Sequence, residues 1–305
     1  MRRLVLAAAM MGTAFGAQAA DMPDLPILRG SLAPTLSATS RNWDGWYAGG
    51  QVGYSSAEMD FSHSVKSLTN FIERNSVLQA PLADWALLSK NHTQSSGFGA
   101  FVGRNWQWED LVFGFEVNYN YFANLQSFST NSMTRLIVNP AGETPPAGHT
   151  HTYVTTLSGA AGLQIKDVVT FRSRAGWAVG DALPYIFGGL AVGRMDVSRA
   201  ATVHYDKYDD YDQVVQTFVG LDGLGNPIFV SNTVHHTDYL GSNTQSAQER
   251  RSNSFVPGWV AGLGMEYMLW GNLFMRGEWE YVRFLNVKDI TFSANNVRLG
   301  IGYKF

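Results

Sequence analysis

The chain has 305 residues, of which 15% are charged and 13% aromatic, with 31 Gly and a formal net charge of −3. A mean hydropathy of −0.10 excludes a helical membrane protein, and the absence of a basic stripe argues against a nucleic-acid partner. The chain has no Cys, which excludes a disulfide framework and a lipid-modified Cys.

The N-terminus has the pattern of a secretory signal peptide. Arg2 and Arg3 precede an uncharged stretch that runs from Leu4 to Ala20, and Ala17-Gln18-Ala19 fits the small-x-small cleavage rule. We therefore expect residues 1–19 to be removed on export. The alternative is an N-terminal membrane anchor, for which the apolar run is slightly short.

Residues 20–44 contain three Pro and no clear period, so we expect a periplasmic lead-in segment. Residues 45–305 then form the predicted barrel domain. No later segment has 18 consecutive apolar residues, so a membrane could be crossed only by strands, and strands cross lipid only as a closed barrel.

Eight strand-like runs follow in this domain. They are residues 45–59, 96–107, 111–123, 167–179, 183–197, 257–269, 273–284 and 295–305. The last run alternates strictly and ends on an aromatic residue, as outer-membrane strands do. Its apolar face, interpreted as the C-terminal assembly strand, consists of Val297, Leu299, Ile301, Tyr303 and Phe305. The Gly188-Gly189 pair blurs the alternation of the fifth run, whose faces stay unassigned.

Short and long links alternate between these runs. The short links are 108–110, 180–182 and 270–272, and the long ones are about 60–95, 124–166, 198–252 and 285–294. This order predicts an all-β fold: an eight-stranded antiparallel up-and-down transmembrane β-barrel with tight periplasmic turns and long extracellular loops.

The faces opposite the apolar ones carry charges that would point into the barrel. They are Glu116, Arg172, Arg174, Glu266, Arg276, Glu278, Glu280, Arg298 and Lys304. An eight-stranded barrel is only wide enough for side chains to fill its interior, and buried charges must be paired. We expect an ion-pair network that plugs the lumen. A selective ion path along these charges is the alternative.

Four Trp lie beside the short links: Trp106, Trp108, Trp177 and Trp270. Amphipathic rings favour the bilayer interface, so we interpret them as a periplasmic aromatic girdle. Core packing in a soluble sandwich is the alternative, but a sandwich would not gather its Trp at one end.

All seven His fall in the predicted extracellular loops. They are His63, His92, His149, His151, His204, His235 and His236. Solvated loops collect such residues, and no His pair has metal-site spacing, so no metal and no cofactor are predicted. Hemin capture by His and Tyr is the alternative. The chain has no nucleophile elbow, zinc-protease, P-loop or dinucleotide motif, so we do not expect an enzyme.

Several runs together resemble a known family. They are GWYAGGQVGYSS, GRNWQWEDLVFGFEVNYNY, TFRSRAGWAVGDALPYIFGGLAVGRMD, GWVAGLGMEYMLWGNLFMRGEWEYVRF and VRLGIGYKF. They resemble the opacity-protein-like outer-membrane β-barrel family of surface antigens and porin-like proteins of alphaproteobacteria. The resemblance covers all eight strands. Arg104, where an aromatic is more usual, and the length of 198–252 depart from the family pattern.

The resemblance implies a location in the cell outer membrane, with the lipid bilayer and the barrel-assembly machinery as partners; the machinery would recognise the strand that ends at Phe305. It also implies a structural surface protein, and some relatives bind hemin. We therefore expect a structural surface protein with a charge-plugged lumen, and a narrow porin or a hemin-binding receptor as the alternative. The sequence names no extracellular ligand.

Overall fold

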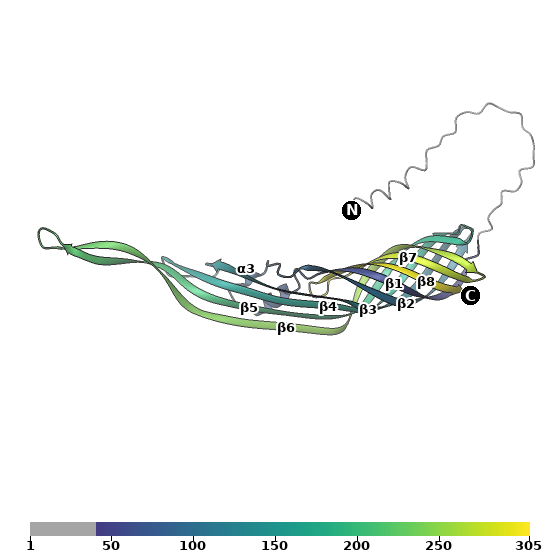
Figure 1. Ribbon diagram of the computed structural model, residues 1–305, viewed down its shortest axis with the longest axis horizontal. Coiled ribbons are helices and arrows are strands. Elements are labelled where there is room, and N and C mark those ends of the chain that lie inside the picture. The colour runs from purple at the N-terminus through teal and green to yellow at the C-terminus, as the bar shows by residue number, and fades with distance from the viewer. Residues whose placement is uncertain (1–40) are drawn as a thin grey trace, which may run out of the picture. The chain divides into compact units, whose positions relative to one another are not determined.

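The computed structural model describes residues 41–305 (Figure 1). The expected signal peptide, 1–19, and residues 20–40 of the expected lead-in segment lie outside the described residues. The described chain forms one closed barrel in which each strand is antiparallel to its neighbours and the last strand pairs with the first. This confirms the predicted all-β, eight-stranded barrel.

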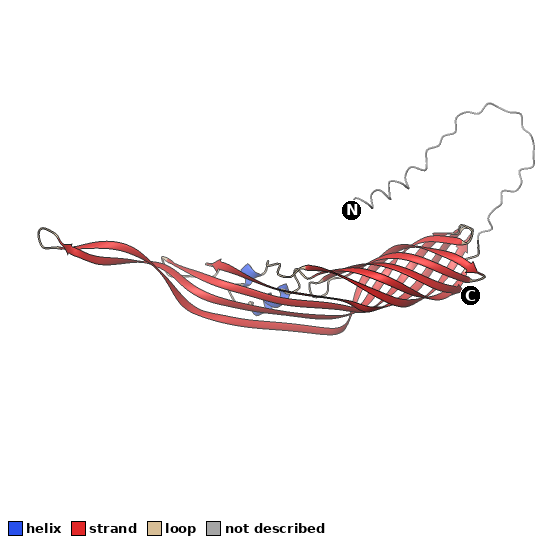
Figure 2. Cartoon of the chain, in the orientation of Figure 1, coloured by secondary structure: helices blue, strands red, loops and turns tan. Residues whose placement is uncertain are grey.

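Strands make up most of the described chain (Figure 2). They are β1 (Gly45–Asp60), β2 (Lys90–Trp108), β3 (Leu111–Val138), β4 (His149–Trp177), β5 (Ala182–Leu221), β6 (Pro227–Trp270), β7 (Leu273–Phe284) and β8 (Thr291–Lys304). Two short helices, α2 (Lys66–Ile72) and α3 (Gln79–Leu82), lie between β1 and β2. Neither of these described helices is long and apolar enough to cross a membrane.

The three predicted short links are confirmed as tight turns. β2 and β3 are joined by 109–110, β4 and β5 by 178–181, and β6 and β7 by 271–272. Glu109, Gly180 and Gly271 adopt positive φ angles of 55°, 58° and 54°, the conformation that two-residue hairpins need. All three turns lie at the same end of the barrel, called here the turn end.

At the other end the structure differs from the expected loops. β3, β4, β5 and β6 continue as strands far beyond the barrel, and links 139–148 and 222–226 are short. The alternation continues as well: on β4, Leu157, Leu163 and Ile165 are buried, while Ser158, Ala160, Gly162 and Gln164 on the other face are only half-buried. Ser, Thr and Gly on the outward face make these segments polar overall, which is why composition suggested loops, but their β-branched residues favour strands.

The continued part of these strands is called here the sheet extension: residues 125–138 of β3, 149–165 of β4, 196–221 of β5 and 227–251 of β6. It is continuous with the barrel wall (Figure 1). The link from β1 to β2 supplies buried residues on α2 and α3, such as Leu68, Ile72 and Leu82, which belong to the same hydrophobic core as Leu157 and Val203 of the sheet. The helices therefore cover the inward face of the extension.

The pair Gly188-Gly189 does not interrupt the alternation of β5. Leu183, Tyr185 and Phe187 are buried inside the barrel, and Ile186 and Leu190 are exposed outside. A Cβ atom on Gly189 would lie 1.9 Å from the carbonyl oxygen of Phe171. This position is therefore Gly because the neighbouring strand approaches too closely for a side chain.

Candidate functional site

The charged interior is a layer of four Glu and four Arg side chains, each at most 4% exposed as a whole residue. The eight residues are Glu116, Arg172, Arg174, Glu266, Arg276, Glu278, Glu280 and Arg298. They come from five strands, β3, β4, β6, β7 and β8. Four positive and four negative charges balance, so the layer as a whole is neutral.

Strand register brings opposite charges together. Three Glu–Arg pairs occupy directly opposed positions on neighbouring strands, where Cβ atoms lie closest. They are Glu116 with Arg172, Glu266 with Arg276, and Glu278 with Arg298. The pairing follows from the register between neighbouring strands, because alternation alone specifies only the face.

The half of this layer nearer the turn end is centred on Glu266. Arg174 donates to both of its carboxylate oxygens at 2.7 Å. Arg276 donates to Glu266 at 2.7 Å and to Glu116 at 2.6 Å, so it bridges the two carboxylates. Tyr47 adds a hydrogen bond to Glu116 at 2.9 Å. Two-point contacts of this kind are the strongest that Arg makes.

The other half joins Arg172 and Arg298 to two acids. Arg172 donates to Glu278 and to Glu280 at 3.1 Å and also pairs with Glu116. Arg298 lies 3.2 Å from Glu278 and also pairs with Glu280. Arg172 thus joins the two halves into one network. A buried charge is strongly destabilising when unpaired, so the network is needed for these residues to be inside at all.

Aromatic rings, which sequence reasoning did not assign to the interior, pack against the guanidinium groups. The Arg276 guanidinium lies 3.7 Å from the centroid of Phe101, and that of Arg172 lies 4.2 Å from Phe187. Cation–π contacts are strongest where water is excluded. The alternation of β2 could have predicted that Phe101 points into the barrel. Phe187 could not be assigned in this way, because it lies in the fifth run, whose faces the sequence left open.

Lys304 is wrongly assigned to the lumen network. Its Nζ atom donates to the backbone oxygens of Asn42 and Asp44 at the turn end, and its side chain is only partly buried. The alternation of β8 predicts that Lys304 points inward, but Lys304 is the last residue of that strand. The strand ends before the side chain can reach the carboxylates.

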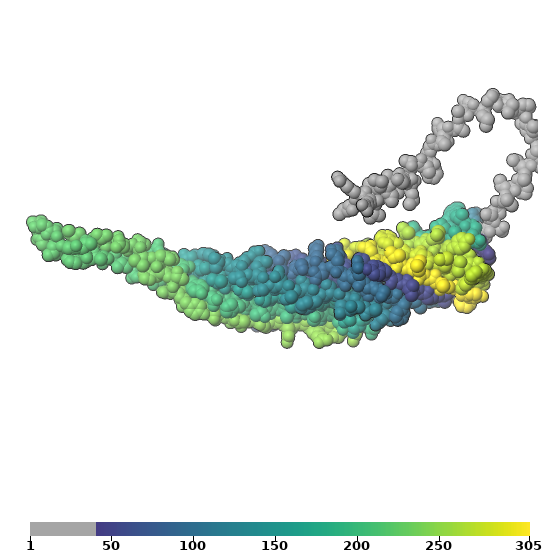
Figure 3. Space-filling model, viewed as in Figure 1, coloured from purple at the N-terminus to yellow at the C-terminus, as the bar shows by residue number. Residues whose placement is uncertain are grey.

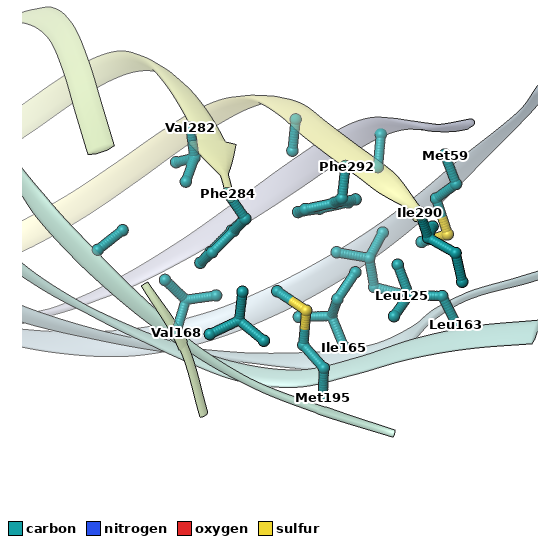
Figure 4. Close-up of a cluster of buried hydrophobic side chains, with 14 of the residues drawn as sticks. Met59, Leu125, Leu163, Ile165, Val168, Met195, Val282, Phe284, Ile290 and Phe292 are labelled. Atoms are coloured by element: carbon teal, nitrogen blue, oxygen red, sulfur yellow. The ribbon is translucent and has the colours of Figure 1, made fainter. Parts of the chain in front are cut away.

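Further layers fill the barrel on both sides of the network. Toward the turn end, Trp43 packs edge-to-face on Phe274 with ring centroids 6.3 Å apart. Toward the extension, Gln51 donates to Asn118 at 2.8 Å and to Asn120 at 2.6 Å. Beyond this polar layer lies a cluster of apolar side chains from several strands, drawn in Figure 4. Its labelled members are Met59, Leu125, Leu163, Ile165, Val168, Met195, Val282, Phe284, Ile290 and Phe292.

Two small interior cavities lie among these layers. One is lined by Ser55, Asn120 and Arg298, and the other by Leu125 and Phe292, among other residues, and each has a volume of about 10 Å³. This is about the minimum for a single water molecule.

The four expected girdle residues, Trp106, Trp108, Trp177 and Trp270, are all exposed on the outward face. Trp108, Trp177 and Trp270 are each the last residue of a strand that runs into a turn. The five residues of the expected assembly strand, Val297, Leu299, Ile301, Tyr303 and Phe305, are likewise exposed. Arg104 also faces outward, 3.2 Å from Asp44.

A second charged cluster lies inside the sheet extension. The guanidinium of Arg199 pairs with Glu249 at 2.5 Å and donates to the backbone oxygen of Ser64 at 2.9 Å, and Lys288 pairs with Glu249 at 2.6 Å. Hydrogen bonds from Lys288 and Arg199 lower the pKa of Glu249 to about 2. The cluster links β5 and β6 to the segments that follow β1 and β7.

A third polar cluster lies where β4 begins. Glu143 accepts hydrogen bonds from Tyr153 at 2.6 Å and Lys207 at 2.9 Å and lies 2.6 Å from His151. Burial alone would raise the pKa of Glu143, but these three partners outweigh it and lower the pKa to about 2. They fasten link 139–148 to β4 and β5.

Three rings are stacked beside this cluster. His149, Tyr211 and His236 are directly opposed on β4, β5 and β6. Their ring centroids are 4.5 Å and 5.3 Å apart, with interplanar angles of 21° and 18°. The Nε2 atom of His236 is buried and has no hydrogen-bond partner among residues 41–305. Six of the seven histidines expected in loops lie on strands, where register decides their neighbours: His92, His149, His151, His204, His235 and His236.

Over the described part of the chain, no group of three or more His, Cys, Asp or Glu side chains is arranged to hold a metal ion.

Comparison with known proteins agrees with this architecture. The family model described as "Outer membrane protein beta-barrel domain" matches residues 5–305. The chain is 22% identical over 306 residues to the 25 kDa outer-membrane immunogenic protein of Brucella ovis, covering 99% of this chain and 96% of that protein. It is also 22% identical to the protein of the same name from Brucella canis, covering 99% and 97%.

Solved structures that resemble the chain include Ail, the attachment invasion locus protein of Yersinia pestis, with 10% identity and a TM-score of 0.31 over 86% of this chain and 99% of that one. Another is Neisserial surface protein A, with 13% identity and a TM-score of 0.30 over 86% and 97%. With the family model spanning nearly the whole chain, this protein belongs to the family of outer-membrane protein β-barrel domains and resides in the cell outer membrane.

Proposed function

We propose that this protein is a closed, non-conducting barrel that anchors the sheet extension on the outside of the cell. The observation that carries the proposal is the network of four Glu and four Arg residues in the barrel interior. An open pore leaves its charges in water, whereas these charges are dry and bind one another. The interior chemistry is therefore that of a plug.

The layers around the network support the same conclusion. Aromatic residues lie on its turn-end side, and amides and then an apolar cluster lie on the other. The two cavities of about 10 Å³ hold at most about one water each. An ion path needs a continuous file of water, which such layers interrupt.

The two ends of the barrel differ, and this difference indicates its orientation in the membrane. Outer-membrane barrels keep short turns on the periplasmic side and long elements outside. Here the tight turns and the exposed Trp108, Trp177 and Trp270 lie at one end and the sheet extension at the other. The extension is accordingly the part that the cell surface presents.

Single-channel recording in planar bilayers tests the closed barrel. The purified protein is expected to produce no stable conductance steps, while a known porin inserted in parallel shows that the bilayer reports channels. Insertion of the protein itself is checked by its protection from protease in the same lipid. Large, long-lived steps from the wild-type protein would contradict the proposal and favour the narrow porin.

The last strand is proposed to be the segment by which the assembly machinery recognises the chain. Its outward residues, from Val297 to Phe305, form an exposed apolar row, and its backbone pairs with β1 to close the barrel. Phe305→Ala is expected to slow barrel formation in the presence of the reconstituted machinery, and Phe71→Ala, on the exposed face of α2, serves as the control. Equal assembly rates would remove the role of Phe305.

Hemin capture is a second candidate function, favoured by the ring stack of His149, Tyr211 and His236. Imidazole and phenolate groups are haem-iron ligands, and His236 Nε2 is without a partner among the described residues. Titration with hemin should then shift the Soret band, and His236→Ala should abolish the shift while His92→Ala, a control on β2, should not. No Soret shift with the wild-type protein would end this candidate.

A further inference from the structure

The far end of the sheet extension is a free two-stranded ribbon. β4 begins at His149, which is opposite Tyr211, so beyond Tyr211 the strand β5 pairs only with β6. We call residues 213–234 the tip hairpin. It is the slender green end of the molecule in Figure 3. Among residues 41–305, no third strand or helix packs on it, so its two faces and its turn are exposed in the described structure.

The tip hairpin is almost uncharged and strongly apolar. Asp222 is its only charged residue, and ten of its side chains are exposed large hydrophobics. The most distal are Phe218, Val219, Leu221, Leu224, Ile228 and Phe229, with exposed fractions from 45% to 89%. Phe218 and Phe229 are paired across the strands with ring centroids 5.9 Å apart. Soluble surfaces seldom gather so many apolar side chains without a partner.

Strands β5 and β6 carry a similarly apolar outward surface where they form the barrel wall. On the barrel wall, which faces lipid, Leu190 and Phe255 are 66% and 73% exposed. Over the described length of β5, no exposed large hydrophobic residue lies between Leu190 and Val214, and on β6 none lies between Leu240 and Phe255. Along β5 and β6 the outward surface is therefore apolar on the barrel wall, polar in the middle of the sheet extension, and apolar again at the tip hairpin. The middle segment is called here the polar zone.

The polar zone separates the two apolar zones by a long distance. The 15 residue-to-residue steps from Leu240 to Phe255 span roughly 50 Å at about 3.3 Å per step. The ladder between β5 and β6 is continuous apart from its bulges. The tip hairpin is therefore held away from the membrane that contains the barrel.

The arrangement of the apolar residues on the tip hairpin indicates what kind of partner it can bind. A folded protein covers one face of a ribbon, but here Phe218 and Phe229 lie on one face, Val230 on the other, and Leu224 at the turn. A surface that is apolar all round is matched by an apolar medium that can surround it. The acyl chains just beneath the headgroups of a lipid bilayer are such a medium, and apolar side chains reach them from the headgroup boundary.

The negative charges near the tip hairpin determine which lipid surface it can approach. Five Asp residues surround the base of the hairpin: Asp206, Asp209, Asp210, Asp212 and Asp238. The nearby cation, Lys207, is bound by Glu143 at 2.9 Å. An acidic collar repels anionic lipid surfaces and tolerates zwitterionic ones. Asp222 at the turn also opposes full crossing and restricts the hairpin to the headgroup boundary.

We propose that the tip hairpin binds the surface of a second, facing bilayer made of zwitterionic lipid, with its apolar side chains in the interfacial region. This rests on the proposed function in one respect, which is that the extension lies outside the cell. The protein would then connect two membranes, with the barrel in one and the hairpin on the other.

The absence of Cys makes a direct test simple. The Leu224→Cys variant is labelled with an environment-sensitive fluorophore, reconstituted in nanodiscs, and mixed with phosphatidylcholine vesicles. We expect a blue-shifted, several-fold brighter signal that lipid-borne quenchers suppress. A matched label at Ser246→Cys, in the polar zone of β6, should not respond. Phe218→Ser with Phe229→Ser should weaken vesicle binding by about tenfold or more, because two buried rings are lost.

Three results would overturn the proposal. One is no response of the Leu224 label to phosphatidylcholine vesicles. Another is stronger binding when phosphatidylserine is added to the vesicles, because the acidic collar requires weaker binding. The third is a bright signal before vesicles are added, which places the hairpin in its own membrane or against a second copy.

The experiments distinguish a failure of the membrane-binding proposal from a failure of the proposed closed barrel. The Phe218 and Phe229 positions contact no other element, so the double variant should keep the wild-type circular dichroism, and a failed fold would be visible there. A conducting barrel would contradict the closed plug and leave vesicle binding untouched. Labelling of Leu224→Cys on intact cells by a membrane-impermeant maleimide tests the orientation by itself.

Discussion

Glu266 on β6 and Arg276 on β7 occupy directly opposed positions of one hairpin, with Arg276 Nη2 2.7 Å from Glu266 Oε1. The same carboxylate also binds both terminal nitrogens of Arg174, two strands away. One carboxylate thus binds two buried cations, of which Arg276 is also paired with Glu116. Because neither Arg can reach water, the barrel depends on Glu266 for the stability of this layer.

Glu266→Gln should therefore be strongly destabilising. It leaves Arg174 and Arg276 with one fewer compensating charge in a dry interior, and loss of a buried partner costs about 3–5 kcal/mol. Urea titration in lipid vesicles, followed by Trp fluorescence, measures the free energy of unfolding. Lys304→Ala is the matched control and should stay within about 0.5 kcal/mol of wild type. If both variants lowered the free energy of unfolding equally, Glu266 would be no more important to the barrel than Lys304, which contradicts the prediction.

Gly189 and Gly188 give a second prediction because they are neighbours with opposite surroundings. Gly189→Ala should cost about 3 kcal/mol, since its Cβ would lie 1.9 Å from the Phe171 oxygen and the strands would have to separate. Gly188→Ala should be tolerated, because its nearest contact would be 3.7 Å away. Folding yield and urea midpoints of the two variants decide, and a tolerated Gly189→Ala would mean that the strand spacing is wrong.

Leu78 and Phe71 provide the same kind of comparison for the helical cover. Leu78 is 0% exposed and belongs to the core shared with the sheet extension, whereas Phe71 is 60% exposed. Leu78→Ala should cost about 2–5 kcal/mol locally and release residues 61–89 to proteolysis, and Phe71→Ala should not. Barrel unfolding should be unchanged in both variants, because the cover lies outside the barrel wall.

Glu143 predicts how the extension responds to acid. Its pKa in the folded chain, about 2, is below the ordinary value of 4.5. Its contribution to stability is therefore fully present above about pH 4.5 and is lost as the pH falls from there toward 2. Hydrogen-exchange protection of residues 139–153 should decrease between pH 6 and pH 3.

The control for this prediction is Glu143→Gln. The variant should already have reduced protection at pH 6 and should lose little more at pH 3. A wild-type segment that keeps its protection at pH 3 would show that the bonds from Tyr153 and Lys207 do not stabilise link 139–148.

The sequence alone determined the number of strands, the tight turns and the faces of most barrel strands, although not those of the fifth. Alternation is a local property, so Val297 and Arg298 could be assigned to opposite faces without knowledge of any other strand. The eight-stranded barrel and the outer-membrane location followed from such local patterns, which closed barrels repeat from strand to strand.

Only the tertiary structure decided which residues meet. Register placed Arg276 against Glu266, stacked His149 on Tyr211, and left Lys304 at the rim, because strand pairing, and not the pattern along one strand, decides which side chains face each other. The sheet extension also needed the structure, since its Ser- and Thr-rich outward face is polar like a loop and only pairing with neighbouring strands shows it to be sheet. The apolar tip hairpin also needed the structure, because β4 begins only at His149 and leaves Phe218 and Phe229 without cover.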